Sequence, residues 1–247
     1  MVHRSAEMNG IKFDLMSLHG LADYLRTHDY SKKGYICLPD FYAFYYIIKH
    51  KLPQRILNDS LLTLMDGKLI EVLLRIKGSK NINTISGYWL CRELLKTDLR
   101  HYFLGPDERT NSRMKENILK EFPDARICGF ESLPFLDINH IAGNNSIRSI
   151  INKIIIAKPD IVWIGIGSPK QDILMNSFCN ELNSGIMIGI GGVFDYMAGN
   201  VKISPEWIKK IGLRWLYRLV QNPRRFYKKS VSYFTGLVYL IKHQIPK

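Results

Sequence analysis

Residues 159–171 read Pro-Asp-Ile-Val-Trp-Ile-Gly-Ile-Gly-Ser-Pro-Lys-Gln, a short apolar run that leads into a glycine turn. The run 161–164 is bulky and apolar enough for a buried parallel strand. Gly165 and Gly167 permit a tight turn and let a ligand approach the backbone closely. Pro169 suits the first position of a helix, whose free N–H groups favour an anion such as a diphosphate. The stretch therefore predicts a strand, a ligand-binding loop and a helix.

A second unit of the same kind occupies residues 186–195. It consists of an apolar strand, the turn residues Gly191 and Gly192, and Asp195. The segment 169–182 predicts the helix that joins the two units, so their strands should be neighbours in one sheet. Ligands of open α/β sheets bind at the carboxyl ends of the strands, and both glycine loops should open there.

The first loop is an incomplete dinucleotide-binding fingerprint, because the pattern Gly-Ile-Gly-Ser-Pro-Lys lacks the third glycine. No acid follows at the roughly 20-residue spacing that would hold a ribose. The pattern therefore disfavours a nicotinamide-dependent oxidoreductase.

The rest of the chain alternates between apolar strand patterns and amphipathic helix patterns, which is typical of an α/β fold with a mainly parallel, Rossmann-like sheet flanked by helices. Strands are expected at 35–38, 61–65, 101–104 and 126–129, helices at 15–28, 40–50, 68–76, 88–97, 111–122 and 146–157, and a loop at 130–145. After Gly199 the pattern predicts helices only. We therefore expect an α/β core at 1–201 and a basic helical appendage at 202–247.

Composition narrows the class of protein. A chain of 247 residues that is 46% hydrophobic can bury a full core. The four cysteines are scattered without a C-x-x-C pair and the seven histidines are dispersed, which indicates a reduced compartment and argues against a structural zinc site. No signal peptide opens the chain, and no apolar run reaches the roughly 18 residues of a membrane span. We expect a cytoplasmic protein.

Positive charge concentrates at the carboxyl end of this chain of net charge +13. No Asp or Glu follows Glu206, whereas the basic residues are Lys209, Lys210, Arg214, Arg218, Arg224, Arg225, Lys228, Lys229, Lys242 and Lys247. Aromatic residues are interleaved with them, which fits an anionic membrane surface or a nucleic acid. The spacing of Phe226, Val231, Phe234, Val238 and Ile241 predicts one apolar helix face. Since no RNA-binding signature is present, we favour the membrane surface over nucleic acid.

Seven motifs, in this order, resemble the WecG/TagA/CpsF glycosyltransferases (glycosyltransferase family 26). They are Leu64-Met65-Asp66-Gly67, Ile85-Ser86-Gly87, Tyr102-Phe103-Leu104-Gly105, Gly165-Ile166-Gly167-Ser168-Pro169-Lys170-Gln171, Gly191-Gly192-Val193-Phe194-Asp195 with Gly199, Trp215-Leu216-Tyr217-Arg218-Leu219, and Pro223-Arg224-Arg225. The resemblance covers roughly residues 8–228.

The chain departs from the family pattern at several positions. The early strand ends Cys37-Leu38-Pro39 where the family has Thr-x-Asn, and Thr84 stands in place of a basic residue. The other departures are Trp89 and Arg214 in place of acids, Asp172 in place of Glu, and Ile203-Ser204-Pro205 in place of Arg-Ala-Pro. These departures leave the donor sugar and the roles of Cys37, Pro39, Thr84 and Trp89 open.

The resemblance implies an inverting transfer of a sugar from a UDP-sugar to a polyprenyl-diphosphate-linked sugar. It places the enzyme at the inner face of the plasma membrane, in the assembly of teichoic acid, common antigen, capsule or exopolysaccharide. It implies no metal and no other cofactor. The alternative is a non-catalytic α/β module that binds a nucleotide or nucleic acid. The acceptor linkage and the oligomeric state stay open.

Asp66 is the candidate base, because it directly follows the predicted strand 61–65 and would project into the ligand crevice. An inverting transfer needs one base to take the acceptor hydroxyl proton as the diphosphate leaves. The residues alone leave open that Asp66 and Gly67 form only a turn or a helix cap.

The strand-end loops supply the candidate contacts to the donor and its UDP. These are Gly105, Gly165, Gly167, Lys170, Gln171, Gly191, Gly192 and Asp195. The Gln171 amide can bond uracil, ribose or phosphate oxygens. Lys170 either offsets diphosphate charge or is solvated, and Asp195 either binds donor hydroxyls or caps a turn.

The leaving UDP needs charge stabilisation, and no Asp-x-Asp metal motif is visible in the sequence. Cations and helix N-termini must therefore supply it. Arg218, Arg224 and Arg225 can fold over the site and meet the diphosphate of the donor or of the lipid. The other interpretation of these arginines is a solvated basic helix.

Overall fold

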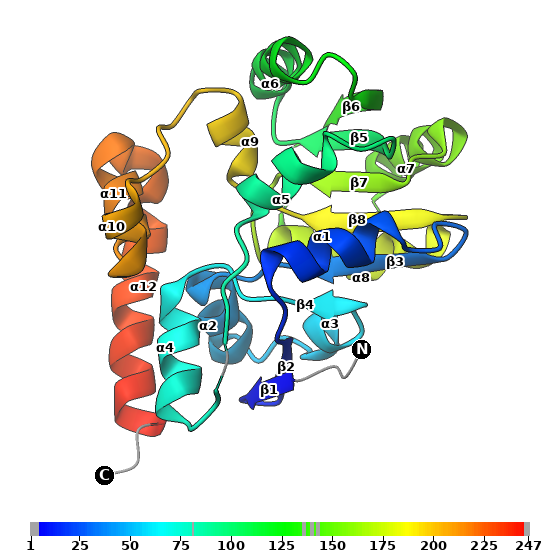
Figure 1. Cartoon of the computed structure of the whole chain (residues 1–247). Helices are drawn as coiled ribbons and strands as arrows, with labels where there is room; N and C mark the ends of the chain where they lie inside the picture. Colours follow the sequence, from blue (N-terminus) through cyan, green and yellow to red (C-terminus); the bar gives the residue numbers. More distant parts are fainter. Residues whose placement is uncertain (1–4, 81, 135–136, 139–140, 142–143, 245–247) are drawn as a thin grey trace.

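The computed structural model describes residues 5–80, 82–134, 137–138, 141 and 144–244, and it has a six-stranded sheet at its centre (Figure 1). The order of the strands is β4-β3-β8-β7-β5-β6, and every neighbouring pair is parallel. These strands are β3 Lys33–Cys37, β4 Leu62–Thr63, β5 Arg100–Gly105, β6 Arg126–Ser132, β7 Ile161–Ile164 and β8 Gly185–Gly189. The α/β prediction is confirmed, and β7 and β8 are neighbours as expected.

Helices follow most of the strands. Those of the core are α1 Leu18–Arg26, α2 Phe41–Lys49, α3 Arg55–Asn58, α4 Lys68–Ile76, α5 Gly87–Leu94, α6 Glu108–Glu121, α7 Asn145–Ala157, α8 Lys170–Phe178 with the 3₁₀ turn Cys179–Glu181, and α9 Val193–Met197. The carboxyl-terminal segment adds α10 Glu206–Lys210, α11 Arg214–Gln221 and α12 Pro223–Gln244.

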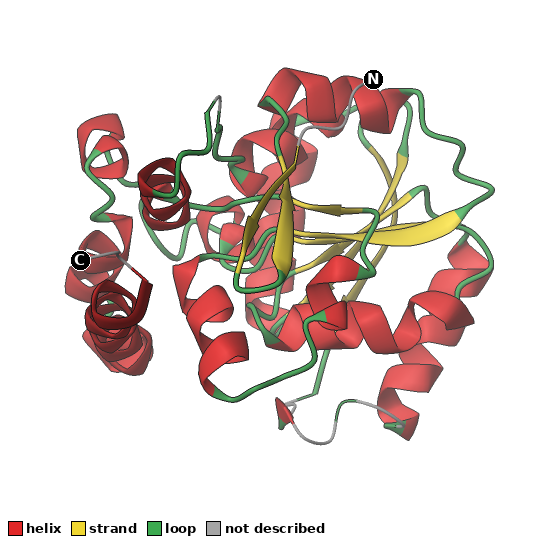
Figure 2. Ribbon diagram, turned by 90° about the horizontal axis from the view of Figure 1, so that it is seen from below, coloured by secondary structure: helices red, strands yellow, loops and turns green. Residues whose placement is uncertain are grey.

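Helices cover both faces of the sheet (Figure 2), and the alternation of side chains along each strand builds a core on each face. Tyr102 and Leu104 of β5 belong to the cluster that packs under α7 and α8, whereas Phe103 belongs to the cluster under α1, α5 and α6. Because both faces are covered, the central strands have continuous apolar stretches, such as Ile161–Ile164 of β7, which is why they were visible in the sequence.

Local signals set several helix starts. Asp40 and Asp107 cap α2 and α6, and their side chains accept hydrogen bonds from the N–H groups of Ala43 (3.0 Å) and Thr110 (2.7 Å). Helix α2 therefore begins directly after Asp40, within one residue of the predicted start of the helix 40–50. Helix α6 begins three residues before the predicted Asn111.

The amino-terminal segment differs from the prediction. A β-hairpin of β1 Ser5–Met8 and β2 Ile11–Asp14 precedes α1, and Asn9 and Gly10 form its turn with positive φ angles of 55° and 73°. Of the predicted helix 15–28, only Leu18–Arg26 is helical. Strand β6 also extends into the predicted loop 130–145, part of which lies outside the described residues.

Helices α10 to α12 stand beside the edge of the sheet at which the strands end (Figure 1). Tyr233 of α12 packs between Phe41 of α2 and Trp215 of α11, with ring centroids 5.5 and 5.7 Å apart. A Cβ at Gly236 would lie 2.7 Å from the Tyr45 ring, so this glycine permits α12 to approach α2 closely. The helical appendage at the carboxyl end is thus present, while the division into domains at residue 201 stays a prediction.

The predicted apolar face of α12 is only partly the exposed one. Val231, Phe234 and Val238 are exposed, and Tyr227 joins them one turn earlier. Phe226 instead lies against the Arg218 guanidinium, 5.4 Å from its ring centroid. The Ile241 side chain lies outside the described part of the structure.

Candidate active site

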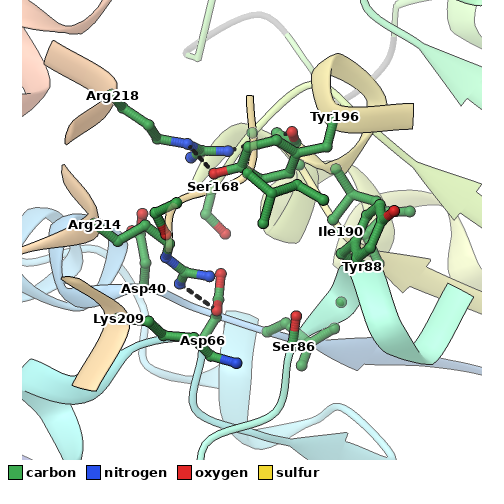
Figure 3. Close-up of a pocket in the computed structure, with 18 of the residues that line it drawn as sticks. Asp40, Asp66, Ser86, Tyr88, Ser168, Ile190, Tyr196, Lys209, Arg214 and Arg218 are labelled. Atoms are coloured by element: carbon green, nitrogen blue, oxygen red, sulfur yellow. Dashed lines mark hydrogen bonds and ion pairs between the residues drawn. The ribbon is translucent and has the colours of Figure 1, made fainter. Parts of the chain in front are cut away.

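An open cavity of about 740 Å³ lies where the carboxyl ends of the strands meet the helical appendage (Figure 3). The core lines it with Leu38, Asp40, Asp66, Ser86, Gly87, Tyr88, Trp89, Gly167, Ser168, Gln171, Ile190, Gly191, Gly192, Val193 and Tyr196, and the appendage with Ile203, Ser204, Glu206, Lys209, Arg214, Arg218 and Lys229.

Asp66 reaches the cavity from the end of β4, as the sequence predicted. Its backbone N–H donates to the Pro39 carbonyl at 3.1 Å, which ties the end of β4 to the segment after β3. Its carboxylate accepts a hydrogen bond from the Arg214 guanidinium of α11 at 2.5 Å. The negative charge of Asp66 raises the pKa of Arg214 further, so Arg214 is always charged.

Asp40 makes a second ion pair between core and appendage. Lys229 of α12 lies 2.6 Å from its carboxylate and 5.1 Å from the Tyr42 ring centroid. Burial favours the neutral acid, but the charge of Lys229 and the Ala43 N–H hold the pKa of Asp40 below its usual value. Asp40 therefore carries a negative charge at neutral pH, at the end of β3.

Gln171 forms a hydrogen bond to the backbone of the first glycine loop. Its Oε1 atom accepts the Gly167 N–H at 3.1 Å, and the side chain is buried. Gly167 and Gly191 have φ angles of 86° and 51°, a region that favours glycine. The two loops can therefore bring bare backbone to the cavity wall.

Asp172 lies directly beneath the same loop and is fully buried. Its carboxylate accepts a hydrogen bond from the Ser168 hydroxyl and faces the Cys37 thiol, while its Oδ1 atom has no hydrogen-bond partner. Burial raises the pKa of Asp172 to about 6, although these hydrogen bonds oppose the shift.

Arg218 joins the appendage to the second glycine loop. Its Nε atom donates to the Tyr196 hydroxyl at 2.7 Å, and a terminal nitrogen donates to the Gly192 carbonyl at 3.3 Å. The guanidinium also lies over the Tyr196 ring, 4.6 Å from the centroid. Figure 3 shows Arg218, Tyr196 and the Arg214–Asp66 pair around the same hollow.

Comparison with known proteins identifies the family. Residues 6–246 match the model of the Glycosyl transferase WecG/TagA/CpsF family. The chain belongs to this family. It is therefore a glycosyltransferase.

Three similar relatives are each named as an N-acetylglucosaminyldiphosphoundecaprenol N-acetyl-beta-D-mannosaminyltransferase. The protein of Bacillus subtilis (strain 168) is 27% identical over 232 residues, which cover 91% of this chain and 86% of the relative. The protein of Bacillus spizizenii is 27% identical over 195 residues, 77% of this chain and 72% of the relative. The protein of Staphylococcus aureus (strain MRSA252) is 23% identical over 208 residues, 82% of this chain and 78% of the relative.

This WecG/TagA/CpsF glycosyltransferase brings together at the cavity six of the residues proposed from its sequence. These are Asp66, Gly167, Gln171, Gly191, Gly192 and Arg218. Lys170 and Arg224 are not among the lining residues, and the Arg225 side chain lies outside the described part of the structure.

Three other proposed residues, Gly105, Gly165 and Asp195, are not among the residues that line the cavity, and each has close contacts within the core. A Cβ at Gly165 would lie 2.1 Å from the Phe194 ring, and one at Gly105 would lie 1.7 Å from the Asn111 side chain. Both glycines therefore allow a neighbouring side chain to pack against a strand end. Asp195 is buried, and its backbone carbonyl accepts the Asn200 N–H at 2.8 Å.

Sequence reasoning missed most of the charged lining of this glycosyltransferase. Asp40 follows a buried strand just as Asp66 does, so the same signal marked it. Lys209, Arg214 and Lys229 carried no comparable signal, because nothing in a basic helical sequence tells which cations turn inward. All four lysines and arginines that line the cavity come from the appendage.

Two further properties concern the residues that the structure describes. No three His, Cys, Asp or Glu side chains in that part of the chain gather as metal ligands would. None of its helices is both long and apolar enough to cross a membrane.

Proposed function

We propose that this enzyme transfers an N-acetylhexosamine from a UDP-sugar to a hydroxyl of a polyprenyl-diphosphate-linked sugar, with inversion. The observation that carries the proposal is the meeting of the Asp66 carboxylate with four cations in one open cavity. The names of the relatives, which describe transfer of N-acetylmannosamine to N-acetylglucosaminyldiphosphoundecaprenol, support this donor sugar and this acceptor. Assembly of a surface polysaccharide such as teichoic acid fits the same substrates.

The cavity has the parts that such a transfer needs. Asp66 takes the proton of the acceptor hydroxyl while the acceptor oxygen forms a bond to the anomeric carbon. The bond from that carbon to the diphosphate oxygen breaks on the opposite side, and UDP leaves with the bonding electrons. Cations preorganised around the hollow, with Arg218 and Lys209 on its appendage wall, stabilise the charge that develops on UDP. Gln171 and the two glycine loops hold the nucleotide.

We further propose that the enzyme works at the inner surface of the plasma membrane. A polyprenyl-linked acceptor is anchored in lipid, so its diphosphate sits at the surface where the enzyme must meet it. Tyr227, Val231, Phe234 and Val238 form an exposed apolar stripe on α12, on a helix rich in cations. Such a helix binds an anionic interface through apolar contact and charge attraction together.

The test of the proposed reaction is Asp66→Asn. The substitution keeps the size of the side chain but removes the base, so we expect kcat to fall by about 10²- to 10⁴-fold. Turnover is measured with a panel of UDP-sugars and a synthetic lipid-diphosphate-sugar, and UDP affinity is measured by calorimetry. Asp124→Asn is the control, because Asp124 is exposed between α6 and β6, outside the cavity lining.

Two outcomes would contradict the proposal. A wild-type protein that binds UDP but transfers no sugar from any donor would favour the non-catalytic nucleotide-binding alternative. Turnover of Asp66→Asn near that of the wild type would remove Asp66 as the base.

A further inference from the structure

The proposed base is engaged by the appendage in this structure. Arg214 of α11 holds the Asp66 carboxylate at 2.5 Å, and the two side chains are only 23% and 31% exposed. A carboxylate oxygen that accepts a hydrogen bond from a guanidinium is not free to accept the proton of an acceptor hydroxyl. Asp66 must therefore loosen this contact before it can take a proton efficiently.

Arg214 is well placed to exchange partners. It lines the same cavity as Gly167, Gly191 and Gly192, whose loops are the proposed seat of the nucleotide. A diphosphate carries more negative charge than one carboxylate, and a guanidinium binds its oxygens in a planar, bidentate way. A donor in the cavity would thus compete directly with Asp66 for Arg214.

A smaller hollow beside the cavity supports this role. Asp66, Thr84 and Arg214 line it together, and Lys68 and Lys209 lie at its other sides. Thr84 gives the core wall of this hollow an uncharged side chain beside Asp66, and Arg214 reaches the Asp66 carboxylate from the appendage wall.

We propose that Arg214 is a positioning residue that passes from Asp66 to the donor diphosphate when the donor binds. The handover frees the base only in the complex with donor, and it places the cation on the UDP that will leave. After UDP departs and Asp66 releases its proton, the pair forms again. This inference rests on the proposed function, since it assigns Arg214 a part in that reaction.

Several other charged or titratable groups line the cavity and the hollows beside it, around Asp66. They are Asp40, Lys68, Tyr196, Glu206, Lys209, Arg218, Lys229 and Tyr233. The test therefore needs a comparison in which only Arg214 changes.

The first measurement compares UDP with UMP by calorimetry. If Arg214 binds the diphosphate, Arg214→Gln should lower the affinity for UDP by about tenfold, which corresponds to the loss of one charge-assisted hydrogen bond. The affinity for UMP, which lacks the second phosphate, should fall much less. Lys210→Gln removes the same charge from an exposed position outside the cavity lining and should change neither affinity. Equal loss of UDP and UMP affinity, or no loss, would overturn the proposal.

The second measurement separates kcat from KM. In the proposal Arg214 binds the diphosphate both in the donor complex and as UDP leaves, so Arg214→Gln should raise the KM for the UDP-sugar and also lower kcat. The KM for the lipid-linked acceptor should stay the same. A lower kcat with an unchanged KM for the UDP-sugar would show that Arg214 does not bind the donor, and would overturn the proposal.

A further variant keeps the test decisive. Circular dichroism and thermal unfolding establish whether Arg214→Gln is folded. If it is not, Arg214→Lys is used, which retains the charge but loses the bidentate geometry, and should show the same changes to a smaller degree. Failure of the proposed function would appear as absence of transfer by the wild type, whereas failure of this inference leaves wild-type transfer and the Asp66→Asn defect intact.

Discussion

Asp172 shows how a single buried acid beneath the site can set pH behaviour. Its side chain has no exposed surface, contacts Ser168 and faces Cys37. Asp172 and Cys37 lie together. The shorter acid and the thiol thus form one local arrangement under the first glycine loop, which holds Ser168 in place.

We predict that Asp172→Asn removes a pH dependence of stability. Burial raises the native pKa of Asp172 to about 6, from the value near 4 of an unfolded chain. Between these values the native state binds more protons than the unfolded state, so the free energy of unfolding of the wild type falls as pH rises. Asn does not titrate, so the free energy of unfolding of Asp172→Asn lacks this fall with pH. The difference between the two proteins should change in favour of Asn by on the order of 2–3 kcal/mol from pH 4 to pH 7.

Urea unfolding at several pH values measures this difference. Asp124→Asn serves as the control, since Asp124 is exposed and should give a difference that changes little with pH. A constant difference between Asp172→Asn and the wild type across this range would contradict the prediction.

At the scale of elements, the strands were predictable and the hairpin was overlooked. Continuous apolar runs form the buried parts of four strands, because both faces of the sheet are covered. They are residues 35–37 in β3, 102–104 in β5, 161–164 in β7 and 186–188 in β8. The hairpin β1–β2 had a signal too, since Asn9-Gly10 is a typical two-residue turn between alternating apolar positions. Strand β4 is only two residues long and lies at an edge of the sheet, paired with β3 alone. A run of apolar residues does not reveal that a strand has one neighbour.

The two glycine loops should respond differently to an added methyl group. A Cβ at Gly165 would lie 2.1 Å from the Phe194 ring in the packed core, whereas one at Gly192 would lie 2.4 Å from the flexible end of Arg218. Gly165→Ala should therefore destabilise the protein by about 1–3 kcal/mol or more. Gly192→Ala should unfold near the wild-type midpoint but lose turnover, because it displaces Arg218 from the cavity wall.

Chemical unfolding and the transfer assay together separate these two effects. Gly192 has φ −67°, which alanine adopts without strain, so backbone conformation does not confuse the comparison. A Gly192→Ala variant with full turnover would show that the position of Arg218 does not matter for transfer.

At the scale of the whole molecule, the site exists only where core and appendage meet. The core contributes Asp40 and Asp66, and the appendage contributes the cations that pair with them. The sequence predicted Asp66 and the glycine loops because each follows a strand. It did not predict Arg214 or Lys229, because their positions depend on how α11 and α12 dock, with Tyr233 held between Phe41 and Trp215.

The same docking leaves the opposite side of α12 exposed, and this side should bind the membrane. Phe234 is 66% exposed, although it is a large apolar residue next to the inward-facing Tyr233. Phe234→Glu should lower the binding to vesicles of anionic lipid in a co-sedimentation assay by about tenfold. This factor corresponds to the free energy of burying one apolar side chain. Thr235→Glu adds the same charge one residue away without removing apolar surface, so it should bind vesicles much better than Phe234→Glu.

UDP affinity should be the same in both α12 variants, because Phe234 and Thr235 are outside the cavity lining. If the two variants lose vesicle binding equally, charge alone attracts the protein to the lipid and the apolar stripe has no part in it. If neither loses any, α12 is not the membrane contact. Only a selective loss in Phe234→Glu, together with reduced turnover on a lipid-embedded acceptor, agrees with a helix whose two sides serve the cavity and the membrane surface.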